Sequence, residues 1–151
     1  MNQIKGFDEN SFLSNFYPSI IYPNHIKYPT VEHAFQAQKT MDSTARELIR
    51  LCETPGRAKR LGKKVQLRKD WEEVKLNIML NLLRMKFSCQ NNELRLKLIE
   101  TNDAEIIEEN YWNDWGICKG IGENNLGKLL MKVRNEINNG IEHRNKEWVD
   151  K

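Results

Sequence analysis

The run WEEVKLNIMLNLLRMKF, residues 71–87, constrains the fold of this chain more than any other segment. Its apolar residues follow two stripes of a helix, one at positions 74, 78, 82 and 85 and the other at 76, 79, 80, 83 and 87. Two apolar stripes predict a helix that is buried over most of its circumference. Asp70 and Glu73 have the spacing of a capping box at its beginning. We therefore expect a central helix around which the other elements pack.

Shorter segments indicate further helices and one small β element. Thr30 is a good N-cap, so one helix is expected to begin there. A final helix is expected to begin near Asn125, because apolar residues stand at offsets 0, 3, 4, 7 and 11 from Leu126. Gly140 lies just past its end. The other helices are expected over 43–53, from Pro55 onward, and over 92–100. Residues 19–22 and 26–28 predict a hairpin, and residues 104–110 fit either a strand or a helix. The fold class expected is mainly α (α+β).

Length and composition favour one domain in a reducing compartment. The 151 residues suit a single domain over 1–151, with a core over about 12–137 and a polar tail at 141–151. A net charge of +3 is too small to argue for a nucleic-acid binder by itself. Three cysteines and three histidines, all scattered, predict neither a disulfide framework nor a metal site. With no apolar run of about 18 residues, we expect a cytoplasmic protein without a membrane partner; its oligomeric state stays open.

The segment YPTVEHAFQAQKT, residues 28–40, places three polar side chains on one stripe of a helix. Glu32, Gln36 and Lys39 are four and three residues apart, and Phe35 borders them on the apolar side. The stripe fits a solvated helix edge, where Glu32 favours the helix dipole and Lys39 covers apolar surface. It also fits the mouth of a crevice, because the stripe borders the apolar face of the helix through Phe35.

Residues 111–128, YWNDWGICKGIGENNLGK, combine two tryptophans, an aspartate and four glycines before the final helix. Glycine lets the backbone approach a ligand, and a helix N-terminus offers free N–H groups to an anion. Trp115 can stack on a heterocycle, and Lys119 adds a positive charge. A glycine-rich turn with core tryptophans is the alternative.

Two further segments carry candidates for binding. In LSNFYPS, Asn15 and Phe16 are either a turn with aromatic anchors or a contact to the edge of a ligand ring. The basic run from Arg57 to Lys69 is either a solvated face or, through Arg57 near a helix start, a phosphate clamp.

Six segments, taken together and in order, resemble the NADAR family, also described as YbiA-like N-glycosidases. They are FLSNFYPS, YPTVEHAFQAQK, GRAKRLG, RKDWEEVK, MKF and WGICKGIGENNLGKLLMKVR, which span residues 12 to about 137. The resemblance implies a mostly helical domain with a ligand cleft and hydrolysis of the bond between a ribose and a nitrogen base, with no metal or organic cofactor. It implies two substrate classes: phosphoribosylamino-pyrimidine intermediates of riboflavin biosynthesis, which yield ribose 5-phosphate, and ADP-ribosylated guanine in nucleic acid.

The same resemblance assigns roles to individual positions. It makes Glu32 the leading acid/base candidate and places Lys39 in the same segment. Asp114 is a further catalytic candidate. The remaining matched positions are expected to bind substrate: Trp71, Trp115, Gly116, Asn125 and Gly127.

The residue types fit this chemistry. Cleavage of a ribosylamine passes through a positively charged sugar, which a fixed carboxylate stabilises while it deprotonates the attacking water. Lys39 has three open roles: binding phosphate, keeping Glu32 ionised, or attacking C1′ as an amine. A non-catalytic ADP-ribose or nucleotide binder remains the third interpretation, and nucleic acid is expected only as a modified substrate.

Overall fold

The computed structural model describes residues 2–109, 115–116 and 123–141, and in them six α-helices and four short strands form an α+β fold that is mainly helical. The helices are α1 (Val31–Ala37), α2 (Ser43–Arg50), α3 (Pro55–Gly62), α4 (Trp71–Lys86), α5 (Asn92–Ile99) and α6 (Asn125–Asn138). The strands are β1 (Gln3–Lys5), β2 (Pro18–Ile21), β3 (Tyr28–Thr30) and β4 (Glu105–Ile107), with short 3-10 turns at Pro23–His25 and Cys89–Asn91. The expected fold class is confirmed.

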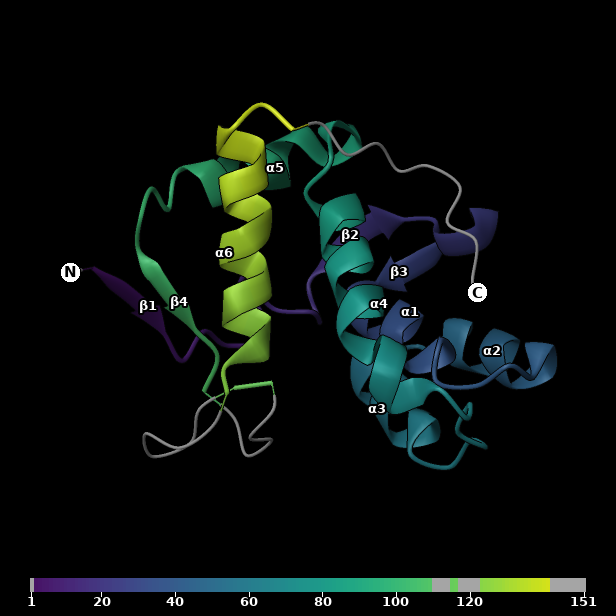
Figure 1. Cartoon of the computed structure of the whole chain (residues 1–151). Helices are drawn as coiled ribbons and strands as arrows, with labels where there is room; N and C mark the ends of the chain where they lie inside the picture. Colours follow the sequence, from purple (N-terminus) through teal and green to yellow (C-terminus); the bar gives the residue numbers. More distant parts are fainter. Residues whose placement is uncertain (1, 110–114, 117–122, 142–151) are drawn as a thin grey trace.

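Helix α4 is the central element, as its two apolar stripes predict. Ile78, Leu82 and Leu83 are buried, and α4 packs against α1, α6 and β2 (Figure 1). One detail of its beginning differs from expectation, because the Asp70 side chain does not cap the helix. Its carboxylate instead accepts a hydrogen bond from Arg68 Nε at 2.6 Å, since the buried guanidinium of Arg68 is the stronger partner.

The predicted hairpin is present, with a shift in its second strand. β2 and β3 pair antiparallel, with Pro18 opposite Thr30 and Ile21 opposite Tyr28. The turn between them takes up Pro23–His25, where Asn24 and His25 both have positive φ, so the second strand begins only at Tyr28. Thr30 then ends β3 and caps α1, as expected, by accepting a hydrogen bond from the His33 N–H at 3.1 Å.

The second pair of strands joins distant parts of the chain. β1 and β4 lie parallel, with Gln3 opposite Glu105 and Lys5 opposite Ile107. The ambiguous segment 104–110 thus contains a strand, and the N-terminal strand that it pairs with was not expected from the sequence. β4 continues directly toward the functional site described below.

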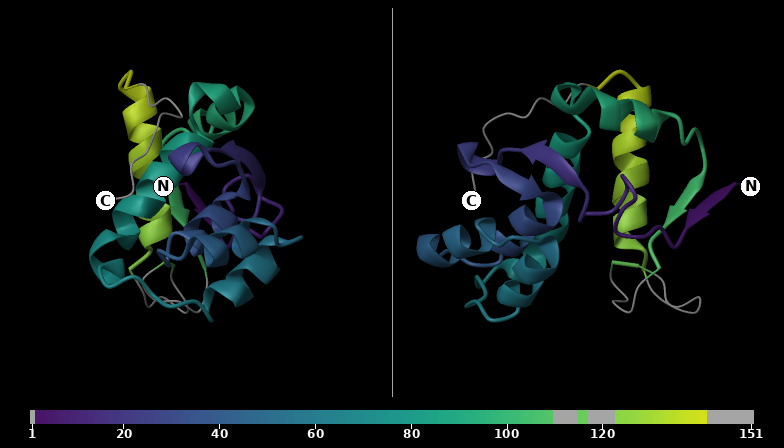
Figure 2. Two further views of the ribbon diagram at one scale, coloured as in Figure 1. Left: turned by 90° about the vertical axis from the view of Figure 1, so that its right-hand side faces the viewer. Right: turned by 180° about the vertical axis from the view of Figure 1, so that it is seen from behind.

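Helix α6 lies between β4 on one side and α4 on the other (Figures 1 and 2). Gly127 permits the contact with β4, because a Cβ at this position would lie 2.1 Å from the carbonyl oxygen of Ile106. The helix ends before Gly140, whose φ of 78° is left-handed, as the sequence predicts. No helix in the described part of the chain combines the length and the apolar character that crossing a membrane requires.

Candidate active site

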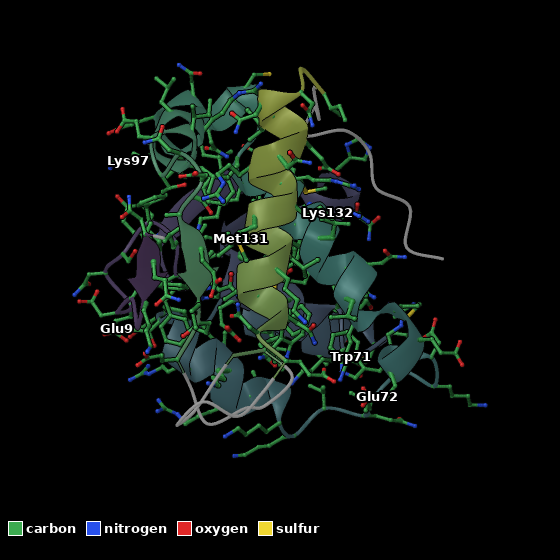
Figure 3. All side chains as sticks on the ribbon, turned by 60° about the vertical axis from the view of Figure 1, so that its left-hand side comes forward. Glu9, Trp71, Glu72, Lys97, Met131 and Lys132 are labelled. Carbon is green, nitrogen blue, oxygen red and sulfur yellow. The ribbon has the colours of Figure 1, made fainter. Side chains whose placement is uncertain are left out.

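A cleft of about 790 Å³ lies at the N-terminal end of α6. Helices α1, α3 and α4 form one wall, and the N-terminal segment, the residue after β4, Trp115 and Leu126 form the other. Figure 3 shows two lining residues, Glu9 and Trp71, on opposite sides of α6. The segment Ser14–Phe16 also lines the cleft. The volume is in the range of pockets that hold a small molecule.

Glu32 lies inside this cleft, although its side chain is almost fully shielded. Glu32 is only 8% exposed, and its Oε2 accepts a hydrogen bond of 2.5 Å from Gln36 Nε2. Its backbone N–H donates to the carbonyl oxygen of Asn15 at 3.0 Å, which ties the beginning of α1 to the segment 14–16. The buried amide oxygen of Gln36 has no hydrogen-bond partner within the described residues. A carboxylate held from one side and open to a cavity on the other is placed to meet a ligand.

The electrostatic environment of Glu32 combines burial with nearby amines. The pKa of the Glu32 carboxyl is raised, because burial outweighs the Gln36 hydrogen bond and the charges of Lys59 and Lys39, which lower it. Burial lowers the pKa of Lys39, and Glu32 raises it, while the neighbouring lysines lower it further. Glu32 and Lys39 thus each favour the charged form of the other.

Three aromatic rings form an apolar surface beside Glu32. Phe35 lies between the two tryptophans, with ring centroids 5.0 Å from Trp71 and 5.3 Å from Trp115. Trp71 begins α4, and the carbonyl oxygen of Trp115 accepts a hydrogen bond of 3.0 Å from the Leu126 N–H at the beginning of α6. All three rings line the cleft, so a flat heterocycle can pack against them.

Four lysines line the same cleft. Lys59 and Lys63 come from α3 and the residue that follows it, Lys39 follows α1, and Lys75 belongs to α4. Lys75 is also paired with Glu72 at 2.8 Å. We call these four residues the lysine cluster. Its positive charge makes this part of the cleft suited to an anion such as a phosphate.

Glycine allows α3 to bring its lysines this close to α1. A Cβ at Gly62 would lie 2.0 Å from Gln36 Oε1 and 3.0 Å from Gln36 Cβ, so only glycine fits without displacing Gln36. Gly62 thereby couples the position of the lysines on α3 to the amide that holds Glu32.

The structure brings together seven of the predicted site residues. The cleft is lined by Asn15, Phe16, Glu32, Gln36, Lys39, Trp71 and Trp115. Asp114 and Lys119 lie outside the described residues.

Four other predicted residues do not line the cleft. Arg57 is exposed and pairs with Glu53 at 3.2 Å, because it lies on the outer side of α3. Asn125 donates to Glu123 at 3.2 Å, and Gly127 packs on β4. Gly116 is buried, and its carbonyl oxygen accepts a hydrogen bond from the Asn124 N–H at 3.3 Å. Gly116 and Gly127 thus contribute through backbone packing near the beginning of α6 and not through contact with the cleft.

Sequence reasoning missed several charged residues of the lining, namely Glu9, Lys59, Lys63, Glu72, Lys75 and Glu108. The four-residue spacing of Lys59 and Lys63 around Gly62 is a signal for these two lysines, because it places both on one helical face. Glu108 has no comparable local signal. Among the described residues, no group of three or more histidine, cysteine or acidic side chains gathers as a metal site.

A mainly helical α+β fold with a carboxylate, an aromatic wall and a lysine cluster in one cleft defines a small domain whose cleft is suited to an anionic ligand. The chain belongs to the NADAR domain family, whose model matches residues 3–138. It is 43% identical to the N-glycosidase YbiA of Escherichia coli K12 and to that of Shigella flexneri, over 86% of this chain and 83% of each relative.

Two further comparisons extend this result. A riboflavin biosynthesis protein of Vibrio vulnificus is 35% identical over 95% of this chain and 40% of its own length. The NMR structure of Escherichia coli YbiA matches with a TM-score of 0.82 and 36% identity, over 95% of this chain and 89% of that chain. The arrangement of helices and strands is therefore that of YbiA.

Proposed function

We propose that this protein is an N-glycosidase that hydrolyses the bond between ribose and the nitrogen base of phosphoribosylamino-pyrimidines and releases ribose 5-phosphate. Hydrolysis of an N-glycosyl bond agrees with the names of its relatives, and two of these, from Vibrio vulnificus and Zea mays, are named for riboflavin biosynthesis. The observation that carries the proposal is the placement of Glu32, the aromatic wall and the lysine cluster in one cleft.

Glu32 has the role of the carboxylate beside the reacting sugar. As the C1′–N bond breaks, its electron pair leaves with the nitrogen, and positive charge develops on C1′ and the ring oxygen. An ionised Glu32 stabilises that charge and accepts a proton from the water that attacks C1′. Gln36 holds one carboxylate oxygen, so the other is available to the water.

The remaining lining residues bind different parts of the substrate. The pyrimidine packs against Trp71 and Trp115, whose rings flank Phe35. The 5′-phosphate lies against the lysine cluster, where Lys39 also favours the ionised form of Glu32. This division replaces Arg57, which lines the neighbouring depression and not the cleft, as the source of the phosphate contact.

Kinetics of Glu32→Gln test the role of the carboxylate. The amide keeps the shape of the side chain but neither stabilises a cation nor takes a proton, so we expect kcat for ribose 5-phosphate release to fall roughly 10²- to 10⁴-fold. Glu47→Gln, on the exposed face of α2, is the matched control and should keep wild-type kcat. Near wild-type turnover by Glu32→Gln would remove Glu32 from this role.

Borohydride reduction during turnover tests the amine route. Attack by Lys39 on C1′ of an opened sugar would form an imine that reduction converts into a stable adduct. We expect no adduct at Lys39, because we assign this lysine to Glu32 and the phosphate. A covalent ribosyl adduct found by mass spectrometry at Lys39 would transfer the leading role to the amine.

ADP-ribosylated guanine is the second candidate substrate, and one observation favours it. Lys63 lines both the main cleft and a neighbouring shallow depression formed with Arg57, Arg60, Leu61 and Lys64. This basic depression adds positive charge beside the lysine cluster, which favours a ligand with a second phosphate. Parallel assays for ribose 5-phosphate and for free ADP-ribose decide between the two substrates, and binding of ADP-ribose without turnover of either would indicate a non-catalytic binder.

A further inference from the structure

Glu108 is a second carboxyl in the cleft, on the wall opposite Glu32. It follows β4 directly, and β4 is held in place by its pairing with β1. The Glu108 N–H donates to Asn124 Oδ1 at 3.0 Å, and Asn124 Nδ2 donates to the Ile106 carbonyl oxygen at 2.9 Å. Asn124 is itself buried and precedes α6. The backbone of Glu108 is therefore fixed by both a strand and a helix beginning.

The environments of the two carboxyls differ in the number of groups that favour the charged form. Glu32 has the Gln36 amide, Lys59 and Lys39, whereas Glu108 has Lys59 alone. Burial and the neighbouring charge of Glu109 raise the pKa of Glu108 to about 7. Burial raises the pKa of Glu32 as well, so the two carboxyls differ in the Gln36 hydrogen bond and the second lysine that favour the charged form of Glu32. Two carboxyls with different surroundings are the usual arrangement for an acid and a base in one site.

Lys59 lies near both carboxyls. Its charge acts on both Glu32 and Glu108, and all three residues line the same cleft. A substrate in the cleft can therefore contact both Glu32, from α1, and Glu108, from the residue after β4. Glu9 lines the wall of Glu108, and Glu109, paired with Lys5 at 3.7 Å, adjoins it in sequence.

The proposed reaction needs a proton at the departing nitrogen. An amino-pyrimidine that leaves without one departs as an anion, which is a poor leaving group. We propose that Glu108 is a second catalytic residue, which donates its proton to the nitrogen of the departing base while Glu32 accepts a proton from the attacking water. The C1′–N bond breaks, a C1′–O bond forms, and the products are ribose 5-phosphate and the free amino-pyrimidine. Solvent then restores the proton to Glu108 and removes one from Glu32.

This inference rests on the proposed N-glycosidase function, and its test uses leaving groups of different quality. The substrates are two ribosylamino-pyrimidine 5′-phosphates that differ at ring position 5, one with an amino group and one with a nitro group. The nitro group delocalises negative charge, so its pyrimidine leaves with less need of a proton. We expect Glu108→Gln to lower kcat at least about 10²-fold for the amino substrate and less than about tenfold for the nitro substrate.

The control for this comparison is Glu105→Gln, at the other end of β4, where the carboxylate faces Gln3 at 3.4 Å. It should leave both rates unchanged. An equal loss on both substrates, or no loss on either, would overturn the assignment of Glu108 as the proton donor. If wild-type protein releases no ribose 5-phosphate, the proposed function fails; if only the leaving-group dependence is missing, the Glu108 inference fails alone.

The wild-type protein provides a second measurement that needs no variant to fold. If Glu108 must be protonated, kcat for the amino substrate falls as pH rises above about 7, and the nitro substrate shows a much weaker fall. The charges of Lys59 and Glu109 act on Glu108 and can shift the pH at which this fall in kcat occurs. A rate that instead rises through this range with the amino substrate would rule out Glu108 as the acid.

Discussion

At position 62 the absence of a side chain decides how closely α3 can approach α1. Gln36 fills the space that a Cβ would occupy, and the same Gln36 holds the carboxylate of Glu32. The geometry of Glu32 thus depends on a residue that does not touch the cleft. The catalytic role proposed for Glu32 requires such support, because a reacting group must be held within a fraction of an ångström.

Gly62→Ala should therefore reduce activity more than stability. The new methyl displaces the Gln36 amide, so we expect kcat to fall roughly tenfold or more, because small displacements of a catalytic group are costly. The free energy of unfolding should fall by only about 1–3 kcal/mol, as for other overpacked sites. Gly56→Ala on the same helix is the control, since the nearest atom to its Cβ would be Thr54 Oγ1 at 3.9 Å. Urea unfolding and steady-state kinetics on both variants measure the two effects. If Gly62→Ala loses no more kcat than Gly56→Ala, the position of Glu32 does not depend on Gly62.

Individual residues of the site differ in how well the sequence predicts them. Glu32, Gln36 and Lys39 could be identified because helical periodicity alone places them on one stripe. Glu108 could not, because its place in the cleft depends on the pairing of β4 with β1, about a hundred positions earlier in the chain. Local pattern contains no information on such a pairing.

At the scale of the element, α3 shows how a basic run divides between two surfaces. Lys59 and Lys63 face the cleft, whereas Arg57 and Lys64 face the neighbouring depression or solvent. The sequence predicts a basic helix but not its rotation about its own axis, since that depends on the contact between Gly62 and Gln36. This is why Arg57 was a reasonable candidate for the phosphate and Lys63 is a better one.

Lys63→Gln tests this division of α3. We expect the KM for the 5′-phosphorylated substrate to rise roughly tenfold, because one charge-assisted contact to phosphate is lost. The KM for the same ribosylamino-pyrimidine without its phosphate should not change. Lys64→Gln, the adjacent lysine that does not line the cleft, is the matched control. If both variants raise the KM equally, the phosphate contact is diffuse and does not depend on Lys63.

The pairing of elements was harder to predict than their existence. All six helices of the described region correspond to predicted segments, because each has its own periodicity or cap. The end of α2 was less well predicted, since the helix stops at Arg50 and the sequence has no glycine or proline there. The close contact between α6 and β4 could not be predicted from the sequence either, although Gly127 is the residue that permits it.

At the scale of the whole molecule, α4 connects the two walls of the cleft. Arg84 on α4 forms a two-point ion pair with Glu136 on α6, with distances of 3.1 and 2.7 Å. At its end, the buried ammonium of Lys86 donates to the Ser14 carbonyl oxygen at 2.8 Å and lies 5.2 Å from the ring centroid of Phe87. Ser14 belongs to the segment that holds the beginning of α1, so the position of Glu32 depends on this end of α4 as well.

Lys86 should make the stability of the fold depend on pH. Burial lowers the pKa of Lys86 to about 7, whereas in the unfolded chain it is about 10.4. Between these values the unfolded state binds more protons, so this lysine makes the free energy of unfolding increase with pH by at most about 1.4 kcal/mol per pH unit. Below about pH 7 its contribution is constant, because Lys86 is protonated in both states.

Urea unfolding of the wild type and of Lys86→Met at pH 6 to 10 isolates this contribution. We expect the difference in unfolding free energy, wild type minus variant, to be flat below about pH 7 and to rise from there toward pH 10. Packing changes caused by methionine are the same at each pH, so they move the curve without changing its slope. Lys128→Met, at an exposed position of α6, is the control and should show no slope. A flat difference for Lys86→Met would mean that Lys86 stays protonated in the fold, and that a counter-charge or water reaches this end of α4.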